Sequence, residues 1–164
     1  MELKKLERKD ERQFRELNET IRVNLSNSDY FMPLGEVVFE NFYNPDMFMT
    51  YGFFDGEKLA ACSLLSFDED DLKELKQLLR LDGKTAEMGA SMTLPEYRGN
   101  NLMFKINEKL LNEAKTTDVK YIVATAHPNN VASNMSLKKL GMIKAAEISR
   151  HGKFKRNVYL YTIK

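Results

Sequence analysis

The sequence predicts an α/β fold in which parallel strands are joined by helices. Segments with helical spacing of apolar residues and segments with strand-like apolar runs succeed each other along the chain. In the middle of the chain the succession is strand, helix, strand, and parallel neighbours require a crossover of this kind. With 164 residues, of which 43% are hydrophobic and 30% charged, and with no linker-like stretch, residues 1–164 are predicted to form a single domain.

Two helices are predicted first. Phe14, Leu17 and Ile21 recur at spacings of three and four, which is typical of an amphipathic helix over residues 10–25. A second, shorter helical stretch is predicted at residues 38–43.

A hairpin and a third helix follow. Asp55-Gly56 lies between two apolar runs, and both residue types tolerate positive φ, so a tight turn is predicted with a second strand at about residues 59–67. Residues 68–81 begin with an acidic cluster, which suits the positive end of a helix dipole, and continue with leucines at helical spacing.

The second half of the chain alternates strands and helices. Strand alternation over residues 85–94 predicts one face with Met88, Ala90, Met92 and Leu94, and another with Glu87, Gly89, Ser91 and Thr93. The remaining predicted elements are a helix from near Leu102, a strand at 119–126, a helix at 131–140 ending at Gly141, and two terminal strands around His151-Gly152-Lys153. The predicted order is α-α-β-β-α-β-α-β-α-β-β.

Composition excludes several classes of protein. Cys62 is the single cysteine, so no internal disulfide is expected, and no Cys/His cluster has the spacing of a zinc site, so no metal is expected. The net charge of +1 argues against nucleic acid as the partner, and no apolar run reaches the length of a membrane span. Residues 1–15 lack the apolar core of a signal peptide, and a cytoplasmic protein is therefore predicted.

The net charge conceals an uneven distribution. Residues 1–82 carry 11 basic and 18 acidic side chains, whereas residues 83–164 carry 14 basic and 6 acidic ones. This asymmetry indicates that the two halves face different partners.

The loop after the strand at 85–94 is the most informative segment. It contains Pro95-x-x-Arg98-Gly99 and leads directly into a predicted helix. Because the first amides of a helix have no partner within it, such a loop can bind an anion. The segment from Arg98 to Met103 is therefore a candidate pyrophosphate site.

A second motif follows the next predicted strand. Asn130 is placed to cap a helix, and Gly141 is placed to end it in the left-handed conformation. Each feature alone has a purely structural interpretation.

Together the two motifs resemble those of the GCN5-related N-acetyltransferase (GNAT) family. The family's loop has the form Pro-x-x-Arg-Gly-x-Gly-x-Gly/Ala, and its next motif is Asn-x-x-Ala/Ser followed by Lys-Leu-Gly-Phe. The residues that fill these places here are Pro95, Arg98, Gly99, Asn130, Ser133 and Lys139-Leu140-Gly141-Met142. The resemblance covers about residues 51–164.

The resemblance implies a mixed central sheet of about six to seven strands, splayed between two parallel strands and flanked by about four to five helices. It implies N-acetyltransferase activity, with acetyl-CoA as co-substrate bound where the strands at 87–94 and 119–127 part. The helices at residues 10–43 would form part of the acceptor wall. The residues that it assigns to the cofactor are Ser91, Met92, Thr93, Arg98, Gly99, Asn100, Asn101, Leu102, Met103, Phe104, Asn130 and Ser133.

Three positions depart from the family's pattern. Asn101 replaces a Gly, Met103 replaces a Gly or Ala, and Leu137 stands where many members have a Tyr that protonates the departing thiolate. Asn tolerates positive φ, and Met103 fits the apolar stripe of the next helix together with Ile106. The departures leave an alternative open, in which the chain is a non-catalytic CoA-binding sensor or interaction module on the same fold.

Two residues are candidates for the general base. Glu87 lies eleven residues before Arg98, a spacing found in many members of the family, although a solvated residue at a strand start is the alternative. His127 ends the neighbouring strand and titrates near neutrality, although a His before a Pro also simply ends strands.

The acceptor is predicted to be the primary amine of an unidentified small molecule or peptide. The basic half of the chain contains the CoA motifs, which suits a polyanionic cofactor, and the acidic half would then favour a cationic acceptor. The oligomeric state stays open, with a homodimer as the commonest form.

Overall fold

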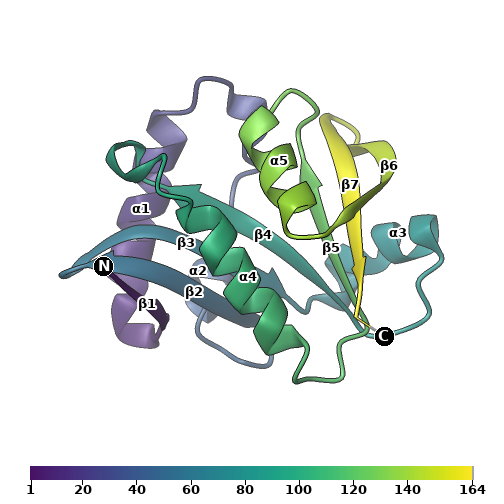
Figure 1. The fold of residues 1–164 in the computed structure, drawn as a ribbon, viewed down its shortest axis with the longest axis horizontal. Helices are drawn as coiled ribbons and strands as arrows, with labels where there is room; N and C mark the ends of the chain where they lie inside the picture. The colour runs from purple at the N-terminus through teal and green to yellow at the C-terminus, as the bar shows by residue number, and fades with distance from the viewer. Residues whose placement is uncertain (164) are drawn as a thin grey trace.

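The computed structural model describes residues 1–163. Its centre is a seven-stranded sheet. The strand order is β1-β2-β3-β4-β5-β7-β6, and only β4 and β5 pair in parallel (Figure 1). The strands are β1 (Glu2–Lys5), β2 (Phe48–Asp55), β3 (Lys58–Ser66), β4 (Thr85–Thr93), β5 (Tyr121–Ala126), β6 (Ile143–Arg150) and β7 (Phe154–Thr162).

Five α-helices flank the sheet, and the predicted fold class is confirmed. They are α1 (Glu11–Val23), α2 (Glu36–Asn41), α3 (Glu69–Leu79), α4 (Leu102–Ala114) and α5 (Val131–Lys139), with short 3₁₀ helices at Arg8–Asp10, Ser28–Tyr30 and Pro95–Tyr97. No helix among residues 1–163 is both long enough and apolar enough to cross a bilayer.

The predicted order of elements is wrong only at its start, where β1 precedes α1. The segment Glu2–Lys5 has charged residues on both faces and therefore lacks the apolar alternation that indicates a strand. It forms a strand because it pairs with the edge of β2, with Leu3 opposite Phe53.

The helices divide into two layers. α4 and α5 cover one face of the sheet, which we call the α4 face, and α1, α2 and α3 cover the other, which we call the α1 face (Figure 1). Apolar side chains fill the space on both sides: Ile106 and Leu110 of α4 belong to one cluster, and Phe14 and Leu17 of α1 to another. The sheet is therefore buried on both faces along its central strands.

The parallel strands β4 and β5 part halfway along their length. Their pairing runs from Thr85 opposite Tyr121 to Met88 opposite Ala124 and ends there. β4 continues to Thr93 along β3, while the end of β5 continues along β7. Beyond Met88, the edge of β4 that faces β5 therefore has no ladder partner, as the resemblance implied.

A bulge in β4 reverses which way its side chains point. Ala90 has a φ of 51°, and the register against β3 shifts at this point. Met88 packs in the cluster beneath α4, whereas Met92 and Leu94 pack in the cluster with α1. The prediction that Met88, Ala90, Met92 and Leu94 share one face is wrong, because the extra residue of the bulge breaks the alternation.

The same bulge separates Glu87 from Thr93. Glu87 pairs with Val123, whose side chain packs against α3 on the α1 face. Thr93 pairs with Ala61, whose side chain belongs to the cluster beneath α4. The predicted common face of Glu87 and Thr93 is therefore also wrong.

Candidate active site

A cavity of about 1220 Å³ occupies the place where β4 and β5 part. Its wall includes Met88 and Ala124 from the cluster beneath α4, and Ile21, Phe48 and Leu64 from the cluster with α1. Because side chains of both layers line it, the cavity extends from the α4 face through the gap in the sheet to the α1 face. The parting of two strands thus creates a passage in an otherwise packed core.

On the α4 face the cavity ends at the N-terminus of α4. The backbone amides from Gly99 to Phe104 donate no hydrogen bond to any acceptor within residues 1–163. Asn101 is the N-cap residue and has a φ of 61°, with no side-chain cap bond, and the first turn of α4 has no acidic residue. Free amides at the positive end of a helix dipole are groups that can bind an anion. The prediction that Asn101 accepts a left-handed backbone in place of Gly is confirmed.

Further unpaired polar groups line the same half of the cavity. In the described part of the chain, Thr93 Oγ1, Asn107 Oδ1 and Ser136 Oγ are buried and have no hydrogen-bond partner, and all three residues lie in the cavity wall. Buried polar groups are usually paired, so these atoms indicate a ligand with polar groups of its own. The peptide-like arm and the pyrophosphate of CoA would meet these atoms and the loop amides, so the residues present fit that molecule.

Met103 and Leu137, which depart from the family's pattern, both lie in the cavity wall. Met103 is half-buried and does not belong to the apolar cluster beneath α4, where Leu102, Ile106 and Leu110 lie instead. The predicted place of Met103 in the stripe of α4 is therefore wrong. Leu137 is buried and brings no hydroxyl group to the site.

The α5 end of the cavity is fixed by a set of amide side chains. Asn130 caps α5, as predicted, with its Oδ1 accepting from the Ser133 amide at 3.3 Å. Asn134 is buried, and its Oδ1 accepts from Asn157 Nδ2 at 2.9 Å and from the Tyr159 hydroxyl at 2.6 Å. These bonds hold α5 against β7. Gly141 follows with a φ of 99°, so the predicted left-handed end is confirmed.

The structure does not bring His127 into the cavity wall. Its side chain is buried, its Nδ1 accepts from the Asn129 amide at 3.0 Å, and its ring packs 4.9 Å from that of Tyr30. A base must reach the proton that it removes. The position of His127 corresponds to the alternative in which this residue ends the strand.

On the α1 face the cavity wall carries charged side chains. Glu87 receives two hydrogen bonds from Arg150, at 2.5 and 2.7 Å, and the side chains of the pair are only 13% and 3% exposed. Burial lowers the pKa of Arg150, but the bonds and charge of Glu87, and then the charges of Asp71 and Glu74, raise it above its ordinary value overall. The two hydrogen bonds join β4 to β6.

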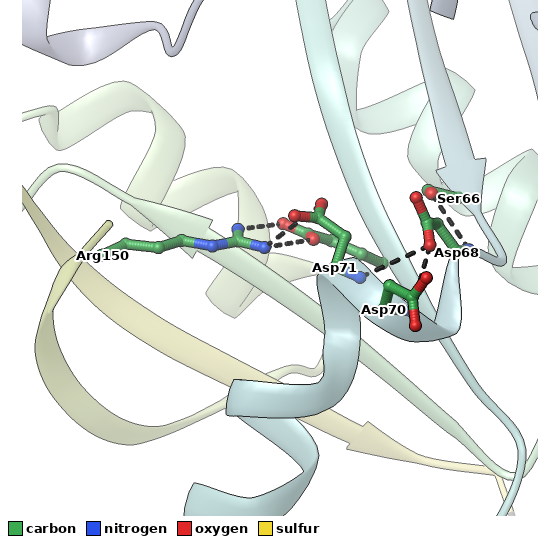
Figure 2. A network of polar contacts seen from close by, with 6 residues as sticks. Ser66, Asp68, Asp70, Asp71 and Arg150 are labelled. Atoms are coloured by element: carbon green, nitrogen blue, oxygen red, sulfur yellow. Dashed lines mark hydrogen bonds and ion pairs between the residues drawn. The ribbon is translucent and has the colours of Figure 1, made fainter. Parts of the chain in front are cut away.

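Figure 2 shows how Arg150 extends toward the first turn of α3. Asp71 Oδ2 lies 3.6 Å from Arg150 Nη2, and Asp68 caps the helix by accepting from the amides of Asp70 and Asp71 (Figure 2). The acidic cluster expected to start this helix therefore also contacts the cavity wall.

Arg156 is the second arginine of this wall. It is 2% exposed, and its guanidinium donates to the backbone carbonyls of Lys155 and Asp29, each at 2.7 Å. The bond to Asp29 fixes the segment between α1 and α2 against β7.

The segment between α1 and α2 closes the cavity on the α1 face. Tyr30, Phe31 and Leu34 from this segment and Val38 from α2 line it. Among residues 1–163, no group of three or more His, Cys, Asp or Glu side chains is arranged to hold a metal ion.

The structure thus assembles most of the sequence-predicted site. The predicted residues in the cavity wall are Glu87, Ser91, Met92, Thr93, Arg98, Gly99, Asn101, Leu102, Met103, Phe104, Asn130 and Ser133. Asn100 and His127 are outside it; the Asn100 side chain donates to the Tyr97 carbonyl at 3.0 Å.

Sequence reasoning missed Arg150, Arg156, Phe154 and Asn107. The two arginines lie in the two predicted terminal strands, one on each side of the turn between them. Arginines in predicted strands were the only sign in the sequence that these side chains could be buried.

A family model described as an acetyltransferase (GNAT) domain matches residues 10–143. The chain therefore belongs to the GNAT acetyltransferase family, and its N-acetyltransferase class follows from that family. A search of curated proteins found no match.

Solved structures of low sequence identity share the fold. An N-acetyltransferase from Staphylococcus aureus Mu50 has a TM-score of 0.77 at 16% identity, covering 99% of this chain and 98% of its own. The ribosomal-protein-S18-alanine N-acetyltransferase of Escherichia coli has a TM-score of 0.73 at 14% identity, covering 99% and 94%. NAA60 from Arabidopsis thaliana in complex with acetyl-CoA has a TM-score of 0.73 at 13% identity, covering 98% and 97%.

Proposed function

We propose that the protein transfers an acetyl group from acetyl-CoA to a primary amine of a small molecule or peptide. The observation that carries this proposal is the cavity that passes through the gap between β4 and β5 and ends at the free amides of α4. One half can hold a thioester cofactor while the other admits an amine, and the two meet where the strands part.

The α4-face half of the cavity would hold acetyl-CoA. The amides from Gly99 to Phe104 would bind its pyrophosphate, with Arg98 at the exposed rim adding charge. The free edge of β4 and the unpaired Asn107 and Ser136 would bind its pantetheine arm. The bound cofactor supplies the activated acetyl group as a thioester.

The α1-face half would position the amine. Its nitrogen forms a bond to the acetyl carbon while the carbon–sulfur bond breaks, the amine loses a proton, and the thiolate of CoA leaves. We assign the proton to Glu87, directly or through a water. Its two oxygens each receive one bond from Arg150, which orients the carboxylate and leaves lone pairs on both oxygens. Unpaired backbone amides of β4 near Met92 would stabilise the charge on the acetyl oxygen.

A thiol-release assay with acetyl-CoA and a panel of polyamines, amino acids, aminoglycosides and peptides tests the proposal. We expect CoA release with at least one amine class, and a higher Tm in the presence of acetyl-CoA. If millimolar acetyl-CoA gives no Tm shift and no amine releases CoA, the proposal is wrong.

The role of Glu87 has a separate test. Glu87→Gln should lower kcat by about a hundredfold or more, the usual scale of general-base catalysis, with little change in acetyl-CoA affinity. Glu74→Gln removes an equal charge from exposed α3 near Arg150 and should leave kcat unchanged. Equal kcat values for the two variants would remove Glu87 from its role.

A second candidate function is a non-catalytic CoA-binding module. The buried Leu137, in place of a thiolate-protonating Tyr, and the engagement of both Glu87 oxygens by Arg150 favour it. Binding of acetyl-CoA without turnover of any amine would support it. A cytoplasmic location and a homodimer remain predictions of the sequence.

A further inference from the structure

Arg156 is a buried cation without a carboxylate partner. No Asp or Glu oxygen within residues 1–163 comes within ion-pair distance of its guanidinium, which is unlike that of Arg150. Its two hydrogen bonds go to backbone carbonyls and leave its other N–H groups without a protein acceptor. Burying a charge in this way is costly unless something neutralises it.

The open side of Arg156 faces the cavity on its α1 half. Arg156 pairs with Ile148 across β6 and β7, and Phe154 pairs with Arg150, so the two arginines lie on the same face of neighbouring strands. Of the acids on this face, Glu87 and Asp71 are bound to Arg150, and Asp29, whose charge acts on Arg156, forms no ion pair with it. The positive charge of Arg156 is therefore not balanced by a paired carboxylate.

The electrostatic surroundings agree with this description. Burial, and then the charge of Arg150, lower the pKa of Arg156, and Asp29 opposes them only in part. The Phe154 ring, whose centroid lies 5.4 Å from the guanidinium carbon, gives one flat surface on which the cation rests. These contacts orient the guanidinium fork without supplying an anion.

We infer that Arg156 binds an oxyanionic group, a carboxylate or a phosphate, of the acceptor molecule. The acceptor would then carry both an amine and an anion, as free amino acids do, rather than being purely cationic as the charge distribution of the sequence favoured. Guanidinium binds such oxyanions through two parallel hydrogen bonds. The inference rests on the proposed function, because it takes the α1 half of the cavity as the acceptor site.

Matched pairs of amines test this inference in the thiol-release assay. Lysine is compared with lysinamide, and phosphoethanolamine with ethanolamine, so that one member of each pair carries an oxyanionic group and the other does not. We expect kcat/KM to be at least tenfold higher for the anionic member of a pair, and the pair with the larger ratio identifies carboxylate or phosphate. Ratios near one in both pairs would overturn the inference.

Two variants test whether Arg156 causes the preference for amines that carry an anion. Arg156→Gln should reduce the ratio to near one, whereas Lys155→Gln, which removes an equal charge from the exposed neighbour, should keep it. If Arg156 only anchors the segment at Asp29, Arg156→Gln should lower kcat/KM equally for both members of a pair. The ratio of the two kcat/KM values would then be unchanged, and this result would overturn the inference. Where Arg156→Gln does not fold, Arg156→Lys keeps the charge but loses the fork, and the ratio should fall by several-fold.

A binding measurement separates this inference from the proposed function. With CoA present, lysine should raise the Tm of the protein, or phosphoethanolamine should do so, and the corresponding partner that lacks the anion should not. Equal shifts or no shift within the pairs would overturn the inference even without turnover. CoA release at equal rates with amines that carry an anionic group and amines that lack one would leave the proposed function standing and remove only the anion site.

Discussion

The two halves of the cavity are built from different chemical groups. On the α4 face the wall contains backbone amides from Gly99 to Phe104 and buried neutral side chains, with Arg98 at its exposed rim. On the α1 face the wall also contains buried charged side chains, with Glu87, Arg150 and Arg156 brought together from β4, β6 and β7. The first half depends on local backbone conformation and the second on long-range strand pairing, so mutations should affect them in different ways.

The largest expected effect is on the half of the cavity on the α1 face, which we call the charged half. Arg150→Met leaves the Glu87 carboxylate, which is 13% exposed, without its partner and should lower the free energy of unfolding by about 3 kcal/mol. Urea unfolding measures the change. The same substitution at Arg22, which pairs with Glu19 at a side-chain exposure of 61%, should cost less than about 1 kcal/mol.

The double variant Arg150→Met with Glu87→Gln sharpens this test. Removing both charges removes the unpaired carboxylate, so most of the lost stability should return. If the double variant is as unstable as Arg150→Met alone, Arg150 contributes through packing and the ion pair is not the cause.

The half of the cavity on the α4 face should be sensitive to mutations that change the backbone conformation of its loop. Gly99 has a φ of 85° and Gly56, in the β2–β3 turn, has a φ of 60°, and an added Cβ would meet nothing within 4 Å at either position. Alanine at each position should therefore cost about 1 kcal/mol of stability for the left-handed backbone. Only Gly99→Ala should also shift the loop amides and weaken acetyl-CoA binding, by about tenfold.

Titration calorimetry with acetyl-CoA distinguishes these two glycine variants, and Gly56→Ala controls for stability alone. Equal acetyl-CoA affinity for both would mean that the loop conformation at Gly99 does not determine cofactor binding.

The difference between the halves also explains what the sequence could predict. The loop of free amides before α4 follows from a local pattern, because a strand, a turn with Arg98-Gly99 and a helix start contain all its groups. The half on the α1 face does not, because nothing in the sequence near Glu87 indicates that Arg150 will lie beside it. That contact depends on β7 being inserted between β5 and β6 in the sheet.

Two further errors have local causes. Ala90 forms a bulge although it is not a glycine, so strict alternation placed Thr93 on the wrong face. β1 was missed because Glu2–Lys5 becomes a strand only by pairing with β2. Most helix bounds, in contrast, were predicted to within two residues, as for α3 at Glu69–Leu79, because an N-cap and an apolar stripe are both local features.

The smallest expected effect tests whether Asp71 is a true member of the charged half. Asp71 is 49% exposed and its Oδ2 lies 3.6 Å from Arg150, so the pair is screened by solvent, unlike the pair with Glu87. Asp71 also lies in the first turn of α3, where a negative charge is favourable to the helix. Asp71→Asn therefore loses two small contributions, and Asp70→Asn in the same turn loses only the second. We expect urea unfolding to give values for the two variants within about 0.5 kcal/mol of each other, and the difference should shrink further in 1 M salt, where the screening length is about 3 Å. A difference near 2 kcal/mol would contradict the description of Glu87 and Arg150 as a pair, and would make Asp71 a third partner equal to Glu87.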